Sequence, residues 1–127
     1  MTIDPTKLKV AESHSRKEIL FRMAVSGDRI LAGGSDAIIH EINLAEKPTE
    51  DVRQLAQHRG YISGCVCHEN TLISGAYDGK LIWWDIEKGE VSHVIEKAHR
   101  RWVRHIALSN DGKLAASVSD DMDCHVW

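Results

Sequence analysis

Residue types that could form a hydrolytic triad occur together in the middle of the chain. His58, Ser74 and Asp78 could act as general base, nucleophile and orienting acid. The same three types recur further along, as His99, Ser117 and Asp121. A hydrolase needs one active site rather than one in each repeat, and neither serine stands in a Gly-x-Ser-x-Gly nucleophile turn. We therefore predict that the chain is not an enzyme and that these side chains have a structural role.

The recurrence belongs to a longer internal repeat. The segment TLISGAYDGKLIWWD, residues 71–85, aligns without a gap on KLAASVSDDMDCHVW, residues 113–127, at an offset of 43 residues. A weaker copy, RILAGGSDAIIHEIN, occupies residues 29–43, with Ala32 in place of the serine and Ile42 in place of Trp84. A period of about 40–45 residues predicts propeller blades of four strands.

The segments around these anchors have the pattern of short strands. Turn signals separate them, at Ser26-Gly27-Asp28, Lys88-Gly89 and Asn110-Asp111-Gly112. No helical period of apolar residues persists for more than a turn. The sequence therefore predicts an all-β fold of antiparallel four-stranded blades, about three in this chain.

These residues resemble the WD-repeat β-propeller family over roughly residues 8–127. The match is strongest in the second repeat, which has the Trp84-Asp85 pair. The resemblance implies that each good repeat holds its blade together with a hydrogen-bonded network. The implied members are His58, Ser74, Asp78 and Trp84, and then His99, Ser117, Asp121 and Trp127.

The blade boundaries follow from the same alignment. We expect a single propeller segment over residues 1–127, with blades at 14–57 (degenerate), 58–98 and 99–127, the last without its outer strand. Residues 8–13 are predicted to be the outer strand that closes the last blade. Three blades cannot close a ring. The ring is therefore expected to be completed by oligomerisation, as a dimer with six blades or a trimer with nine, or by the remainder of a longer propeller.

One local cluster interleaves basic and aromatic residues in the loop that enters the third repeat. The candidate partner-binding residues there and on the neighbouring repeat are Tyr61, Tyr77, Arg100, Arg101, Trp102 and Arg104. An equally weighted interpretation is a solvated loop whose arginines meet the nearby acids Asp120, Asp121 and Asp123. The resemblance implies a non-catalytic protein- or peptide-binding scaffold or adaptor that grips an acidic or phosphorylated segment. The alternatives are nucleic-acid or phosphate-ligand binding through residues 97–105, and a structural module of a larger multidomain protein.

Composition excludes several other classes of protein. Sixteen Lys and Arg against nineteen Asp and Glu give a net charge of −3, which makes nucleic acid an unfavoured partner. No apolar run is long enough to span a membrane. Three cysteines form no disulfide framework, so a reducing, cytoplasmic location is expected. Cys65, Cys67 and His68 lack a second ligand pair for zinc, so core packing is preferred and neither a metal nor a cofactor is predicted.

Overall fold

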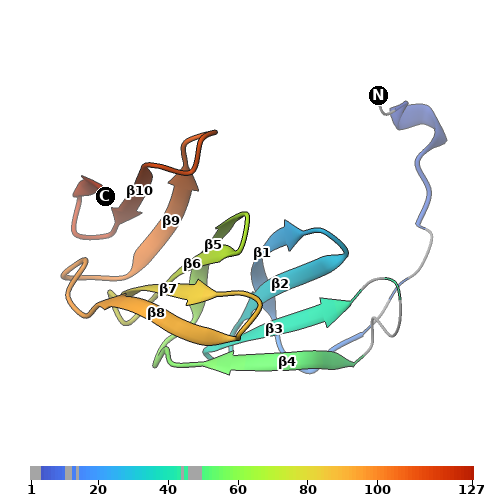
Figure 1. Ribbon diagram of the computed structural model, residues 1–127, viewed down its shortest axis with the longest axis horizontal. Coiled ribbons are helices and arrows are strands. Elements are labelled where there is room, and N and C mark those ends of the chain that lie inside the picture. Colours follow the sequence, from blue (N-terminus) through green and yellow to red (C-terminus); the bar gives the residue numbers. More distant parts are fainter. Residues whose placement is uncertain (1–3, 11–12, 14, 44, 46–49) are drawn as a thin grey trace.

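The computed structural model describes residues 4–10, 13, 15–43, 45 and 50–127. After a short 3-10 helix, η1 (Pro5–Lys7), the described chain is built from β-strands that form three separate antiparallel sheets (Figure 1). The all-β, four-stranded prediction is thus confirmed. The described residues contain no helix long and apolar enough to cross a membrane.

The first two sheets have four strands each, in sequence order. The first sheet consists of β1 (Leu20–Ser26), β2 (Arg29–Gly34), β3 (Ile38–Asn43) and β4 (Asp51–Ala56). The second consists of β5 (Ile62–His68), β6 (Thr71–Ala76), β7 (Leu81–Asp85) and β8 (Glu90–Ile95). The third consists of β9 (Val103–Leu108), β10 (Ala115–Ser119) and β11 (Cys124–Val126).

Each predicted blade range contains one of these sheets. The third sheet has no fourth strand among the described residues, as the predicted range 99–127 implies. Of the segment 8–13, residues 11 and 12 lie outside the described residues, and Leu8–Val10 is exposed and outside any strand. The closing role of that segment and the exact blade limits therefore stay predictions.

Tight turns set the strand order. Gly27, Gly89 and Gly112 stand in hairpin turns with φ of 60°, 69° and 69°, a region that favours glycine because it has no Cβ. These are the three turns that the sequence predicts. Because each hairpin joins consecutive strands, every sheet is an up-and-down meander, with β1, β5 and β9 on the same side of their sheets.

The core lies between the sheets rather than within one of them. One cluster joins the first and second sheets through Leu31, Ile39, Leu55, Ile62, Leu72, Ile82, Trp84 and Ile86. Another joins the second and third sheets through Ile73, Leu81, Val103, Ile106 and Ala115. Leu72 and Ile73 face opposite sheets because successive side chains of a strand alternate in direction. The middle sheet is therefore buried on both faces.

Close approach of the sheets requires small residues on the inner strands. A Cβ built at Gly75 would lie 2.7 Å from Val103 Cγ1, and one at Gly64 would lie 2.8 Å from Ile106 Cγ1. Both distances are shorter than a van der Waals contact. The glycines thus let the third sheet pack directly on the second, which brings the loops at one edge of the sheets together.

Candidate functional site

The second sheet contains a continuous hydrogen-bonded network. His58, in the loop entering β5, places Nδ1 3.0 Å from Asp78 Oδ2 in the β6–β7 turn. Its Nε2 lies 2.8 Å from Ser74 Oγ on β6, and Trp84 Nε1 on β7 donates to that same oxygen at 2.8 Å. The network therefore links the entering loop, the turn and two strands, and it joins all four residues that the sequence groups together.

The geometry gives this serine–histidine–aspartate set a structural role. We call the network of His58, Ser74, Asp78 and Trp84 a clamp, because it holds the entering loop, the turn and two strands together. With the Nδ1 proton donated to Asp78, Ser74 donates its hydroxyl proton to His58 Nε2 and accepts from the Trp84 indole. Ser74 is fully buried and Trp84 is 2% exposed. A hydroxyl enclosed between an imidazole and an indole has no room for a substrate carbonyl. The arrangement satisfies its buried polar groups and fixes one local geometry.

Asp78 is the charged end of this network. Burial opposes its ionisation, but hydrogen bonds from His58 and from the backbone N–H groups of Arg59 and Lys80 lower its pKa below the ordinary value. The carboxylate therefore stays ionised at neutral pH, which keeps the Nδ1 proton on His58.

The third sheet repeats the network. His99 Nδ1 lies 3.0 Å from Asp121 Oδ2 and Nε2 lies 2.7 Å from Ser117 Oγ, which also accepts from Trp127 Nε1 at 2.9 Å. Burial of Asp121 opposes ionisation, but hydrogen bonds from the Arg100 and Asp123 backbone and from His99 lower its pKa. Two sheets of one chain thus have the same clamp at matched positions.

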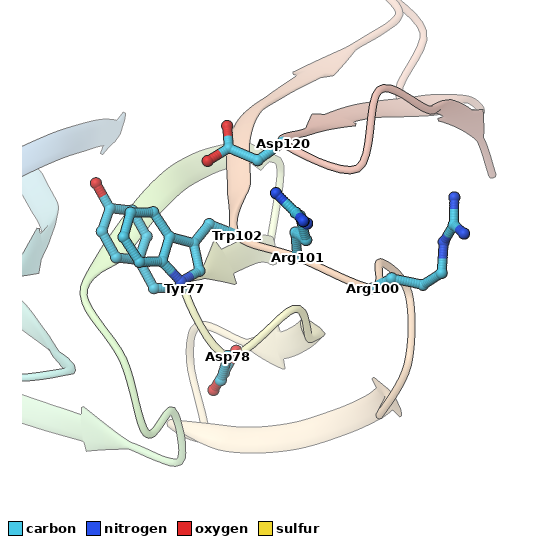
Figure 2. Close-up of a pocket in the computed structure, with 6 residues that line it drawn as sticks. All are labelled: Tyr77, Asp78, Arg100, Arg101, Trp102 and Asp120. Atoms are coloured by element: carbon cyan, nitrogen blue, oxygen red, sulfur yellow. The ribbon is translucent and has the colours of Figure 1, made fainter.

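A gathering of exposed aromatic side chains lies at the edge where β1, β5 and β9 begin. Phe21 and Tyr61 stack with ring centroids 5.6 Å apart, and Tyr61 and Tyr77 follow at 5.5 Å. Tyr77 and Trp102 stack at 4.2 Å with an angle of 2° between their planes (Figure 2). We call Phe21, Tyr61, Tyr77 and Trp102 the aromatic row. Tyr61 and Trp102 are 48% and 47% exposed, so the row offers apolar area to solvent on all three sheets.

Arg104 supports this row rather than standing free beside it. Its Nε and Nη2 form a bidentate pair with Asp120, both at 2.6 Å, and Nη1 donates to the Tyr77 hydroxyl at 3.1 Å. Its guanidinium carbon lies 5.3 Å from the Tyr77 ring centre and 5.2 Å from that of Trp102. The interpretation that Asp120 pairs with an arginine of the cluster therefore fits Arg104.

The two remaining arginines differ in their surroundings. Arg100 pairs with Asp123 at 3.1 Å, and both side chains are largely exposed. Arg101 has no ion pair within the described part of the chain, and it points toward a hollow of about 390 Å³. The hollow is lined by Tyr77, Asp78, Arg100, Arg101, Trp102 and Asp120. Together with the hydrogen bond from Arg104, the positive charge of Arg101 helps to lower the pKa of Asp120, which lines the same hollow.

Sequence reasoning missed Phe21 as part of this edge. The expected histidine of the first repeat, His14, lies outside the described residues. At the offset of 42 residues that relates the first repeat to the second, Tyr61 corresponds to Ile19 rather than to Phe21. The repeat register therefore does not place Phe21 beside Tyr61, and no local motif marks it.

The cysteines contact backbone carbonyls of the neighbouring sheet. Cys65 Sγ donates to the Leu31 carbonyl at 3.4 Å, and Cys67 Sγ donates to the Val25 carbonyl at 3.1 Å. Burial raises the pKa of the Cys65 thiol to about 12 and also raises that of Cys67. Both are protonated packing residues at neutral pH. All three cysteines of the chain are free.

The repeated clamp and the sheet order agree with a comparison against known families. The family model described as "WD domain, G-beta repeat" matches residues 49–85 and 89–127. The chain belongs to the WD-repeat family. Its antiparallel sheets are consistent with WD-repeat blades, and the matched ranges include the clamps at Ser74 and Ser117. Members of this family are generally non-catalytic scaffolds, which agrees with the enclosed serines.

Curated relatives extend the match to nearly the whole chain. A p21-activated protein kinase-interacting protein 1-like protein of Gallus gallus is 31% identical over 116 residues, which are 90% of this chain and 30% of the relative. The nuclear distribution protein nudF of Emericella nidulans is 33% identical over 84 residues, 64% of this chain and 19% of the relative. The chain thus spans less than a third of the length of these relatives.

The first blade departs from the family pattern. Ala32 and Ile42 occupy the serine and tryptophan positions, and His40 on β3 stands where the second blade has Ile82 and the third has His125. Arg16 Nη2 pairs with Asp51 Oδ1 at 2.9 Å. Burial of Asp51 opposes its ionisation, but hydrogen bonds from Gln54, His40 and Arg16 lower its pKa. This blade is held together by charges.

A second charged group of the first blade, formed by Glu41 and Arg53, contacts the second blade. Glu41 is 1% exposed and pairs with Arg29 at 3.2 Å and with Arg53 at 2.6 Å. Arg53 also donates to the backbone carbonyls of Ile86 and Glu87, where β7 ends. The buried Glu41 carboxylate therefore orients Arg53, whose hydrogen bonds link the first blade to the second.

Proposed function

We propose that this WD-repeat chain is a scaffold that binds a protein or peptide along the aromatic row, with Arg101 gripping an acidic or phosphorylated side chain. The observation that carries the proposal is the continuous row of ring contacts from Phe21 to Trp102 beside a hollow lined by Arg101, which forms no ion pair with the described residues. Exposed aromatic residues next to arginine are typical of binding hot spots.

Several features support an extended peptide as the ligand. The row crosses all three blades, so it matches an elongated segment better than a compact small molecule. Its rigid rings lose little conformational entropy on binding. Arg104 is already held by Asp120, so it keeps Tyr77 and Trp102 stacked in the unbound chain. The relatives named as a kinase-interacting protein support a protein partner as well.

The test uses an array of acidic peptides, each in phosphorylated and unphosphorylated form. We expect Trp102→Ala and Arg101→Glu to abolish binding to peptides that the parent chain captures. Lys113→Glu is the matched charge control, because Lys113 is exposed in the β9–β10 turn at the opposite edge of the blade. Equal binding by Arg101→Glu and Lys113→Glu would remove Arg101 from the site.

A single-stranded oligonucleotide serves as the second probe on the same variants. Phosphate contacts release counterions, so nucleic-acid binding weakens steeply as the salt concentration rises. Salt-dependent oligonucleotide binding that is lost in Arg101→Glu, without any peptide binding, would replace the peptide proposal by the nucleic-acid alternative.

We further propose that additional blades cover the two outer faces of the three-blade segment. On the first blade, Met23 and Val25 are 61% and 59% exposed and point away from the second blade, whereas Ala24 between them packs toward it. On the third blade, Val118 and Val126 are 40% and 66% exposed. Exposed apolar faces of this kind favour association.

Light scattering tests whether copies of this chain supply the additional blades. A folded particle with the mass of one chain would contradict a homo-oligomer, and a mass of two or three chains would support one.

The free cysteines, of which Cys65 is buried and Cys124 is exposed, support a reducing, cytoplasmic location for this scaffold. Fractionation of cells expressing the chain would test that location, and recovery with secreted proteins would contradict it.

A further inference from the structure

The first blade contains a buried histidine with a carboxylate at each ring nitrogen. His40 is 1% exposed; its Nδ1 lies 2.8 Å from Asp51 Oδ2 and its Nε2 lies 3.0 Å from Asp36 Oδ2. A neutral imidazole carries one N–H and can donate to only one of them. With the N–H on Nδ1 toward Asp51, the Nε2 lone pair faces the Asp36 carboxylate, and a cation bound between these two groups would remove their repulsion.

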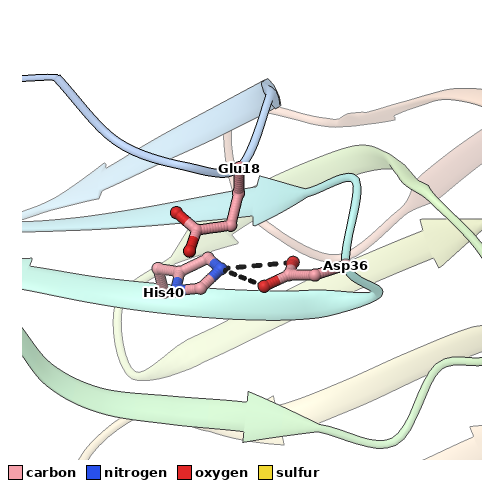
Figure 3. Close-up of side chains that lie close together, drawn as sticks. All are labelled: Glu18, Asp36 and His40. Atoms are coloured by element: carbon pink, nitrogen blue, oxygen red, sulfur yellow. Dashed lines mark hydrogen bonds and ion pairs between the residues drawn. The ribbon is translucent and has the colours of Figure 1, made fainter.

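A third carboxylate completes a set of metal-ligand types. Glu18, Asp36 and His40 each offer one ligand atom, and these three atoms lie within 4.8 Å of one another. Figure 3 shows Glu18 reaching His40 from the segment before β1 and Asp36 reaching it from the β2–β3 turn. One imidazole nitrogen with two carboxylate oxygens is a donor set that suits zinc and similar divalent cations.

The local charges are not balanced by the protein alone. Glu18, Asp36 and Asp51 contribute three negative charges, and Arg16 contributes one positive charge through its pairs with Asp51 and Glu18. These four side chains sum to −2, which one divalent cation cancels. Arg16 Nη2 also lies 3.1 Å from His40 Nδ1.

Asp51 has the geometry of a positioning residue. In the tautomer with the proton on Nδ1, Asp51 accepts that proton and the Nε2 lone pair is directed at Asp36 and Glu18, as in carboxylate–histidine–metal arrangements. Gln54 donates to the same Asp51 oxygen at 2.8 Å and holds it in place. The side chains of Glu18 and Asp36 are 24% and 31% exposed, so an ion can enter and keep a water ligand.

Gly34 keeps the space beside these ligands open. A Cβ at Gly34 would collide with Asp36 Oδ1 and lie 3.2 Å from His40 Nε2. The corresponding position of the second blade, 42 residues on, is Ala76. The first blade thus has a glycine where its charged ligands converge, and the second blade has none.

We propose that the first blade binds a divalent transition-metal cation, of which Zn²⁺ is the probe, through His40 Nε2 and the carboxylates of Asp36 and Glu18. Bound there, the ion links the segment that enters β1 to the β2–β3 turn. His58 and Asp78 join the same two parts of the second blade by a hydrogen bond. The metal takes the place of the serine–tryptophan clamp that Ala32 and Ile42 cannot form.

The test is titration of zinc chloride into the untagged 127-residue chain, by calorimetry and by the thermal unfolding midpoint. A Cys124→Ser background removes the exposed thiol as a competing ligand. We expect one saturable site and a higher midpoint with zinc. Glu18→Gln is expected to abolish the site, and Asp51→Asn to weaken zinc binding about 10- to 100-fold. Glu90→Gln, an exposed glutamate on β8, is the matched control and is expected to bind zinc as the parent does.

Two results would overturn the proposal. One is the absence of saturable zinc binding with an unchanged unfolding midpoint, which would mean that hydrogen bonds and ion pairs alone hold His40 between Asp36 and Asp51. The other is equal zinc affinity in Glu18→Gln and Glu90→Gln, which would place the ion elsewhere. Circular dichroism of each variant without metal checks that it is folded, and Glu18→Gln keeps the test decisive if Asp51→Asn unfolds.

Discussion

The first and second blades share a strand order but are held by different chemistry. In the second, His58, Ser74 and Trp84 form a buried hydrogen-bonded network with a single ionised end at Asp78. In the first, the corresponding space contains several charges around His40, some of them partly exposed. Both arrangements link the turn between the second and third strands to the rest of the blade. The comparison shows that the blade geometry needs a link at this place, and that the link can be neutral and enclosed or ionic and open.

The largest loss of stability is expected when the Trp84 indole of the second blade is removed. Trp84→Ala removes a side chain that is 2% exposed and leaves the Ser74 hydroxyl short of a donor. Truncation of a buried aromatic residue lowers the free energy of unfolding by about 3–5 kcal/mol. Urea denaturation measures the change. A loss as small as that from truncating an exposed tryptophan would show that the neutral network is not what holds this blade.

Asp78→Asn distinguishes the contribution of the ionised Asp78 to stability from that of the neutral part of the network. Hydrogen bonds to a charged group contribute about 1.5–3 kcal/mol, so a loss of that size is expected at pH 7. The folded pKa of Asp78 is lowered from 3.8, so its contribution is present above about pH 4 and is lost as the pH falls through the folded value. The unfolding free energies of the parent and the variant should therefore begin to converge as the pH falls below about 4. A difference that stays constant down to pH 2 would contradict this account.

Arg53→Met tests the ionic link of the first blade. It leaves the buried Glu41 with Arg29 alone and removes the donors to the Ile86 and Glu87 carbonyls. An unsatisfied buried group costs about 1–3 kcal/mol, so the free energy of unfolding should fall within that range. Arg104→Met is the control, because its partner Asp120 is far more exposed and such pairs contribute at most about 1 kcal/mol. Equal losses in the two variants would argue against an inter-blade role for Arg53.

The smallest stability effect is expected at the aromatic row. Trp102 is 47% exposed and stacks on Tyr77 at 4.2 Å. An aromatic pair contributes about 0.5–1.5 kcal/mol, so Trp102→Ala should change the unfolding free energy by no more than that. Thermal unfolding checks it beside Trp84→Ala. A loss that matched Trp84→Ala would mean that the row supports the fold rather than a ligand.

Much of the fold was predictable because the chain repeats itself. The constant offset between Ser74 and Ser117 and between Trp84 and Trp127 located the repeated residues, and the resemblance to the WD-repeat family implied that they form networks. The hydrogen bonds join those residues. The blade that breaks the repeat was the least predictable. His40 meets Asp51 across a strand pair and Arg16 from a segment 24 residues earlier. Such meetings depend on strand register, which sequence spacing does not specify without a repeat to copy.

The sequence by itself determined the blade period, the antiparallel strand order and the positions of the two neutral clamps, because alternation, turn residues and a fixed offset are local properties of the chain. Only the tertiary structure decided which charged side chains are engaged. Arg100, Arg101 and Arg104 are close together in sequence, yet Arg104 is paired with Asp120, Arg100 meets Asp123 and Arg101 is left facing a hollow. Pairing of charges depends on distances between blades, and those distances are set by how the blades pack.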